Sequence, residues 1–208
     1  MCNKSENSPI ELALLQINTF KSKFLRAEGR ATEGYIMLKI MDYILETLED
    51  WKQDDSENTI YRRIATVFDF MFRNTHVKLA EKIDLLIRYG KENKDLELSS
   101  IEFKKPSVTA TIAIAQQCKN LGVNGVILNH LQRLNPKIDS IVAMDWIGST
   151  GYMCCLFPHR GVYVPKLIDT LTIPTSINGV LDFENTLRLL FAFKVFPSPF
   201  PPKRGTID

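Results

Sequence analysis

The sequence predicts an all-α protein, and three observations lead to this expectation. Apolar residues recur at helical spacing, most regularly in the four-residue steps of Ile36, Ile40, Ile44 and Leu48. Glycines or polar clusters separate the apolar runs at intervals that suit helices. One stretch, 108–115, alternates and is β-branched as a strand would be, but it continues to Leu121, and that length favours a helix.

The first helix has the clearest start signal in the chain. In Ser8-Pro9-Ile10-Glu11, Ser8 can cap the helix, Pro9 fits its first turn and Glu11 completes a capping box. The apolar residues that follow lie on more than one face, so we expect one face to pack within the chain and the other against a partner. Gly29 and Gly34 break the pattern after it.

Further helices are expected along the rest of the chain. Their ranges are 32–49, 58–73, 75–89, 107–121, 126–134, 138–147, 165–173 and 183–195, with loops over 91–105 and 148–161. The last thirteen residues contain Pro197, Pro199, Pro201 and Pro202, so we expect an extended tail over 197–208.

Composition bounds the class of protein. The chain has 208 residues, of which 45% are hydrophobic and 24% charged, which excludes a disordered chain, a collagen-like repeat and a bare coiled coil. The net charge is +2. Residues 1–60 hold 7 bases and 11 acids, whereas residues 61–105 hold 10 bases and 7 acids, so an acidic start offsets a basic middle.

Targeting signals are not evident. No apolar run approaches the ~18 residues of a membrane span, and residues 1–8 are too polar for a signal peptide. Four cysteines occur, of which Cys154 and Cys155 are adjacent and would form a strained disulfide. We therefore expect a reducing, intracellular compartment and no membrane insertion.

Enzyme motifs are equally scarce. Neither a P-loop nor a Gly-x-Ser-x-Gly or His-Glu-x-x-His motif is present. Weak candidates are the 148–151 Gly-Ser turn for phosphate, a Cys155–His159 nucleophile pair, and Cys154, Cys155 and His159 as zinc ligands. Asp139 and Asp145 form no repeated carboxylate pattern. We expect no enzyme, no cofactor and no metal.

The middle of the chain carries a family resemblance. Its first two segments are Asp50-Trp51-Lys52 and Tyr61-Arg62-Arg63-Ile64-Ala65-Thr66-Val67-Phe68-Asp69-Phe70-Met71-Phe72-Arg73-Asn74. Together they resemble the nucleocapsid proteins of phlebovirus-like (phenuivirus) negative-strand RNA viruses. The stretch 83–89 is similar to their next helix, and 107–115 to their Leu-Ser-Arg-Val-Ala-Ala-Ala element. The segments 157–160 and 189–193 are similar to later family elements. The resemblance covers roughly residues 32–120.

The resemblance implies a compact, two-lobed helical protein that coats single-stranded RNA without sequence preference. An N-terminal arm (1–30) would dock on a neighbouring subunit, and a basic slot between an N-terminal lobe (31–105) and a C-terminal lobe (106–196) would hold RNA. A viral polymerase would be a further partner, and the protein would occur in the virion and the host cytoplasm.

Candidate residues follow from charge and from the resemblance together. For RNA contact they are Tyr35, Arg62, Arg63, Arg73, His76, Lys78, Lys82, Lys104, Lys105 and Arg160. For oligomerisation through the arm they are Ile10, Leu14, Ile17, Phe20 and Phe24. The alternative hypothesis is a helical adaptor that binds another protein through its first helix or Pro-rich tail and does not bind RNA.

Overall fold

The computed structural model describes residues 8–51, 55–81, 85–91 and 94–195. The predicted tail, 197–208, therefore lies outside the described residues. So does Lys82.

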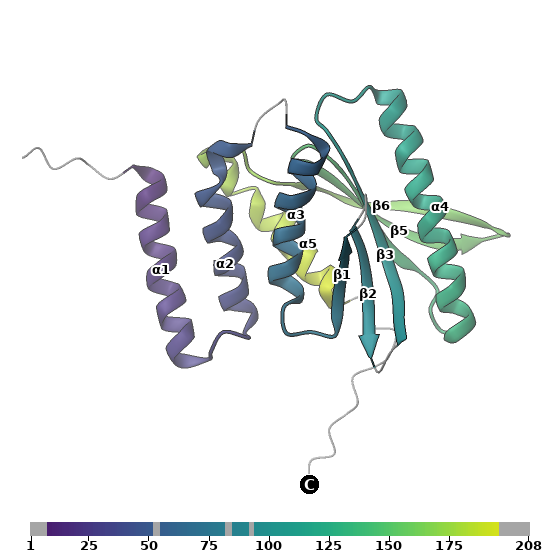
Figure 1. The fold of residues 1–208 in the computed structure, drawn as a ribbon, viewed down its shortest axis with the longest axis horizontal. Coiled ribbons are helices and arrows are strands. Elements are labelled where there is room, and N and C mark those ends of the chain that lie inside the picture. Colours follow the sequence, from purple (N-terminus) through teal and green to yellow (C-terminus); the bar gives the residue numbers. More distant parts are fainter. Residues whose placement is uncertain (1–7, 52–54, 82–84, 92–93, 196–208) are drawn as a thin grey trace, which may run out of the picture.

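The chain is not all-α, because a six-stranded mixed sheet runs through its centre (Figure 1). The strands follow chain order across the sheet, and only β3 and β4 are parallel neighbours. The bounds of the strands are β1 Val77–Glu81, β2 Leu85–Lys91, β3 Lys94–Lys104, β4 Ile141–Ile147, β5 Thr150–His159 and β6 Val162–Thr172.

Five α-helices and two short 3-10 turns accompany the described part of the sheet. The α-helices are α1 Pro9–Ala27, α2 Glu33–Glu46, α3 Glu57–Phe72, α4 Ala110–Leu134 and α5 Phe183–Val195, and the turns are η1 Leu48–Asp50 and η2 Ile177–Val180. Figure 1 shows α3 and α5 on one side of the sheet and α4 on the other. Helices α1 and α2 lie side by side beyond α3, farthest from α4.

Several predicted helices and loops are strands instead, and each error has a physical cause. The predicted helix over 75–89 is the hairpin of β1 and β2, and the predicted loop 91–105 is β3. The predicted helix 138–147 is β4, whose residues 141–146 are all buried, so its apolar run has no alternation to identify a strand. The predicted loop 148–161 contains β5, and the predicted helix 165–173 is β6, which tolerates Pro165 because β6 is an edge strand.

The helices with strong caps are confirmed. At α1 the Ser8 hydroxyl accepts from the backbone N–H of Glu11, and the Glu11 carboxylate accepts from the backbone N–H of Ser8. Helices α2, α3 and α5 match their predicted ranges within a few residues. Helix α4 begins as predicted but continues past Gly122 as one helix of 25 residues, joining two elements that the sequence suggested were separate.

Helix α4 connects the two parallel strands and is fastened to both by buried asparagines. The Asn124 side chain donates to the carbonyl of Ser100 and accepts from its backbone N–H, both at 3.0 Å. One turn earlier, Asn120 donates to the Met144 carbonyl at 2.9 Å. Parallel pairing between β3 and β4 begins only at Ile101, so Asn124 satisfies backbone groups of Ser100 on the side where β4 does not pair.

The sheet crosses the expected boundary between lobes. Strands β1 to β3 come from the segment 31–105 and β4 to β6 from 106–196, and the β3–β4 pairing joins them. The core is continuous across that pairing, with Phe103 and Trp146 fully buried on neighbouring strands. No helix within the described ranges is long and apolar enough to cross a membrane.

Candidate functional site

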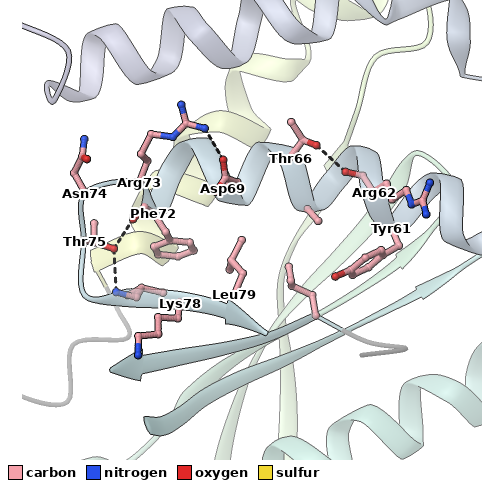
Figure 2. Close-up of a pocket in the computed structure, with 13 residues that line it drawn as sticks. Tyr61, Arg62, Thr66, Asp69, Phe72, Arg73, Asn74, Thr75, Lys78 and Leu79 are labelled. Atoms are coloured by element: carbon pink, nitrogen blue, oxygen red, sulfur yellow. Dashed lines mark hydrogen bonds and ion pairs between the residues drawn. The ribbon is translucent and has the colours of Figure 1, made fainter. Parts of the chain in front are cut away.

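The first candidate site is a cavity of about 600 Å³ between α3 and β1, here called the α3–β1 cavity (Figure 2). Three of the residues expected to contact RNA line it, namely Arg62, Arg73 and Lys78. The structure thus brings together side chains that are up to 16 positions apart in the sequence. Its other lining residues include Tyr61, Phe72 and Leu79.

The charged groups of the α3–β1 cavity do not converge. Figure 2 shows the charged ends of Arg73 and Lys78 pointing away from one another. Arg73 pairs with Asp69 at 2.6 Å, and Lys78 pairs with Asp95 at 3.1 Å. Both pairs are exposed, so solvent screens them and each contributes little stability. The cavity offers a basic rim rather than a built phosphate site.

The remaining candidates for RNA contact are dispersed. Arg63 is half-buried, pairs with Asp55 at 2.6 Å and stacks over the Trp51 ring. Exposed His76 lies edge-on to Tyr89, Tyr35 is half-buried on α2, and Arg160 is in the β5–β6 turn with φ 49°. Lys105 is exposed after β3, whereas Lys104 belongs to a different site described below.

The predicted oligomerisation residues divide between the two faces of α1. Ile17 is buried, and Ile10, Leu14 and Phe24 are half-buried. The Phe24 ring packs so closely on α2 that a Cβ at Gly34 would lie 2.5 Å from it. Phe20 is exposed, as are three leucines that the prediction did not include, Leu12, Leu15 and Leu25.

The second candidate site lies on the α4 side of the sheet, where two acidic side chains are neighbours. Glu102 of β3 and Asp145 of β4 are paired residues in the parallel register, so both side chains project from the same face of the sheet. Both are buried, with 4% and 7% of their surface exposed. We call Glu102 and Asp145 the acid pair.

The acid pair lines a cavity of about 700 Å³, here called the α4-side cavity. Strands β3 to β6 and helix α4 all contribute lining residues, among them Lys104, Gln116, Gln117 and Tyr152. The cavity lies near the carboxyl ends of two parallel strands joined by a crossover helix, which is where open α/β sheets commonly bind ligands.

Side chains on α4 and β3 hold the acid pair in place. Lys119 donates to Glu102 Oε1 at 3.0 Å, and Asn120 donates to Asp145 Oδ1 at 2.8 Å. Lys104 donates to Glu57 Oε1 of α3 at 2.9 Å, and its Nζ lies 3.7 Å from Glu102 Oε2. Removing two carboxylates from water is costly unless positive charge compensates them, and Lys104 and Lys119 supply part of that compensation.

Two buried oxygen atoms of this cavity have no hydrogen bond. They are Glu102 Oε2 and Gln116 Oε1. Buried acceptors are almost always bonded, so an orphan atom in a native structure points to a water, an ion or a ligand. Two such atoms in one cavity, beside a second carboxylate, indicate a site for a cation or a strong donor.

The acid pair is not a complete metal site by itself. Among residues 8–51, 55–81, 85–91 and 94–195, no three His, Cys, Asp or Glu side chains gather to hold a metal ion. The set fits an ion that is satisfied by two carboxylates and takes its remaining oxygens from an amide, water or substrate. Mg²⁺ and Mn²⁺ behave in this way.

Within the described residues, Cys154, Cys155 and His159 do not gather into a group that could hold a metal ion. Cys154, Cys155 and His159 are all on β5, but Cys154 is buried and His159 is exposed near the end of the strand. Burial raises the pKa of the Cys154 thiol, and the Asp145 carboxylate raises it further. A raised pKa keeps the thiol protonated, which is the inert form.

Sequence reasoning named Asp145 without a partner and missed Glu102. A signal was available for Asp145, which interrupts the apolar run 141–147, whereas the stretch 98–103 around Glu102 already contains Ser99 and Ser100 and gave none. A charge in the middle of a buried strand is rare unless it is paired or binds something. The pairing itself joins positions 43 apart in the chain and depends on the register of β3 and β4.

Comparisons with protein-family models, curated proteins and solved structures found no match to this chain. The resemblance to viral nucleocapsid proteins therefore stays a prediction, while the all-α fold that it implied is wrong.

Proposed function

We propose that the protein is a divalent-metal-dependent phosphodiesterase that acts on nucleic acid. The observation that carries this proposal is the acid pair, in which a buried, unbonded Glu102 oxygen lies beside a second carboxylate and a lysine in one cavity. Glu102 and Asp145 are assigned as metal ligands, with Gln116 Oε1 as a neutral third oxygen. This proposal replaces the expectation that the protein is not an enzyme.

The ligand chemistry supports a magnesium-like ion and a phosphate substrate. Mg²⁺ is commonly held by one or two carboxylates, and phosphate oxygens of the substrate and water complete its shell. Neighbouring strands lie about 4.8 Å apart, so two carboxylates on paired residues can share one ion. When bound, such an ion polarises a phosphoryl oxygen and activates a water for attack.

Each surrounding residue has a definite role in this proposal. Lys119 fixes Glu102 through Oε1, and Oε2, which has no hydrogen bond and lies 3.7 Å from Lys104 Nζ, is the oxygen assigned to the ion. Asn120 orients Asp145 from α4. Lys104 donates a hydrogen bond to Glu57, and its ammonium group lies beside Glu102. There it can stabilise negative charge that develops on the phosphate. Hydrolysis adds one water across the P–O ester bond and releases a phosphomonoester and a hydroxyl.

The distribution of charge favours a polyanion over a small phosphate ester. Exposed Lys105 follows Lys104 directly, and the Lys119 side chain, which bonds Glu102, is 62% exposed. Residues 61–208 hold more bases than acids, in contrast to the acidic first sixty. Basic side chains around a phosphate-cleaving site attract and position a nucleic-acid backbone.

The direct test is cleavage of labelled RNA, single-stranded DNA and duplex DNA in Mg²⁺, in Mn²⁺ and in chelator. We expect cleavage of at least one substrate with metal, none in chelator, and a loss of at least about a hundredfold in Glu102→Gln. Glu184→Gln is the matched control, because Glu184 is an exposed glutamate on α5 far from the acid pair. Equal activity of the two variants would contradict the assignment.

We propose RNA coating as a second candidate function, since Arg62, Arg73 and Lys78 border one cavity. In this proposal the protein binds single-stranded RNA without sequence preference and associates with copies of itself through α1. Exposed apolar side chains on α1 support the association. A polymerase partner and a location in virion and host cytoplasm belong to this proposal alone.

A further inference from the structure

A third cavity shares lining residues with the α4-side cavity and has a different chemistry. It measures about 390 Å³ and lies between the residues before α3, the β4–β5 turn and Thr175. We call it the Trp51 cavity; its lining residues are Trp51, Asp55, Ile60, Pro106, Ile147, Gly148, Ser149, Thr150, Tyr152 and Thr175. Its volume is within the ~300–1,000 Å³ typical of small-ligand pockets.

The Trp51 cavity is a neighbour of the α4-side cavity, because Ile147 and Tyr152 line both. The β4–β5 turn in its wall is bonded to the end of β3, since the Gly148 N–H donates to the carbonyl of Lys104 at 2.8 Å. Gly148 has φ +59°, and a Cβ there would lie 2.9 Å from Pro106, so only glycine fits this wall. The geometry therefore couples the position of the Trp51 cavity to that of Lys104.

Most polar groups of the Trp51 cavity are neutral, and several have no hydrogen bond. The Trp51 indole N–H is buried and has no hydrogen bond. The hydroxyls of Ser149, Thr150 and Thr175 also lack hydrogen-bond partners within the described part of the chain. The one acid, Asp55, is already paired with Arg63 at 2.6 Å. None of the described residues that line this cavity is a lysine or arginine that could bind a second phosphate.

Aromatic rings complete the description of this cavity. Tyr152 lies at the junction with the α4-side cavity, and the Trp51 ring has the Arg63 guanidinium 5.1 Å from its centroid. Aromatic walls together with neutral donors and acceptors suit a planar heterocycle, which stacks through its face and hydrogen-bonds through its edge.

We propose that the Trp51 cavity binds the nucleobase adjacent to the phosphate that the acid pair attacks. This inference rests on the proposed phosphodiesterase function and specifies its substrate. A base can enter such a cavity only when it is out of a duplex stack, so the preferred substrate is a single strand or an unpaired stretch.

The test compares ordinary and abasic single strands of the same length and charge. In the Glu102→Gln background, which leaves the strand uncut, Trp51→Ala weakens binding of an ordinary strand about tenfold or more, as measured by fluorescence anisotropy. An abasic strand binds equally to the proteins with Trp51 and with Trp51→Ala. Its affinity for both is as weak as that of the ordinary strand for Trp51→Ala. Leu181→Ala, which removes an exposed apolar side chain before α5, leaves affinity unchanged.

A second variant tests the cavity independently, in case Trp51→Ala does not fold. Thr150→Val keeps the shape of the side chain and removes its hydroxyl, and we expect it to weaken ordinary-strand binding severalfold without changing abasic binding. The inference is overturned if Trp51→Ala and Thr150→Val both bind the ordinary strand with unchanged affinity. It is also overturned if the protein with an unaltered Trp51 cavity binds ordinary and abasic strands equally. Cleavage of abasic strands at the ordinary rate would overturn it while leaving the phosphodiesterase intact. Base-dependent binding without any cleavage would retain the cavity's role and reject the enzyme.

Discussion

The Lys104 side chain connects β3 to α3 and lies beside Glu102, and this makes it a sensitive probe of the acid pair. It bonds Glu57 of α3, approaches Glu102 on its own strand and lines the α4-side cavity. We expect Lys104→Met to lower the rate of strand cleavage by about a hundredfold, the scale seen when a donor to developing charge is removed. Lys105→Met, the exposed neighbour, should change the rate by less than about threefold, which kcat measurements on both variants would check.

Asn124 supports the fold rather than the chemistry. Replacing it by Ala leaves the backbone N–H and carbonyl of Ser100 buried and unbonded, and each such loss costs about 1–3 kcal/mol. We therefore expect Asn124→Ala to lower the free energy of unfolding by about 2–4 kcal/mol in urea titration. Asn129→Ala, on the exposed side of the same helix, should change it by less than about 0.5 kcal/mol. A similar loss in both variants would argue against the buried bonding.

Tyr43 gives a pH dependence with a definite sign. Burial raises the pKa of its phenol above the ordinary value, so the folded protein holds the phenolic proton more tightly than the unfolded chain does. Its contribution to stability is fully present below the ordinary tyrosine pKa near 10 and is lost as the pH rises through the raised value. Stability of Tyr43→Phe should fall less between pH 9 and pH 11 than that of wild type. Parallel curves from urea unfolding would contradict this.

At the scale of elements, capping residues and apolar spacing predicted the positions of α1, α2, α3 and α5 but not those of the strands. The capping box at Ser8 and Glu11 is local, so the start of α1 could be read from the sequence. Leu79, Leu86 and Ile87 satisfy helical spacing, yet β1 and β2 place them in a hairpin, because pairing with β3 decides their conformation. β4 is buried along almost its whole length and carries no alternation to distinguish it from a buried helix.

Helix α1 is the element whose removal the fold should tolerate best. It packs on α2, where Lys21 and Asp42 form an ion pair, and it exposes Leu12, Leu15, Phe20 and Leu25. If those side chains dock on another copy, deletion of residues 1–28 should convert an oligomer into a monomer with the circular-dichroism spectrum of a folded α/β protein. A wild-type protein that is monomeric in size-exclusion chromatography with light scattering would reject the docking.

At the scale of the whole molecule, the low net charge of +2 conceals two unlike regions. Should the rim of the α3–β1 cavity contact RNA, affinity in chelator should fall steeply with salt, by about 0.7 log units per log unit of salt for each phosphate contacted. The triple variant Arg62→Glu, Arg73→Glu and Lys78→Glu should bind more weakly and depend less on salt. If the triple variant binds RNA as wild type does, the cavity is not the RNA site.

The candidate site shows where sequence reasoning stops. Asp145 interrupts an apolar run, which is visible in the sequence, but its juxtaposition with Glu102 exists only because β3 and β4 pair in parallel with these two residues opposite one another. Helix α4 spans that pairing, and its Asn120 and Asn124 bond to residues of both strands. No local pattern encodes this arrangement, so an expectation of an all-helical chain could not contain it.

The most direct test of the central claim is equilibrium binding of Mn²⁺, followed by electron paramagnetic resonance of the free ion. We expect wild type and Glu184→Gln to bind Mn²⁺ alike, and Glu102→Gln and Asp145→Asn each to weaken binding at least tenfold, because each removes a charged oxygen ligand. Circular dichroism would establish that all four proteins are folded. Equal Mn²⁺ binding by all four, or no binding by wild type, would contradict a metal centre at the acid pair.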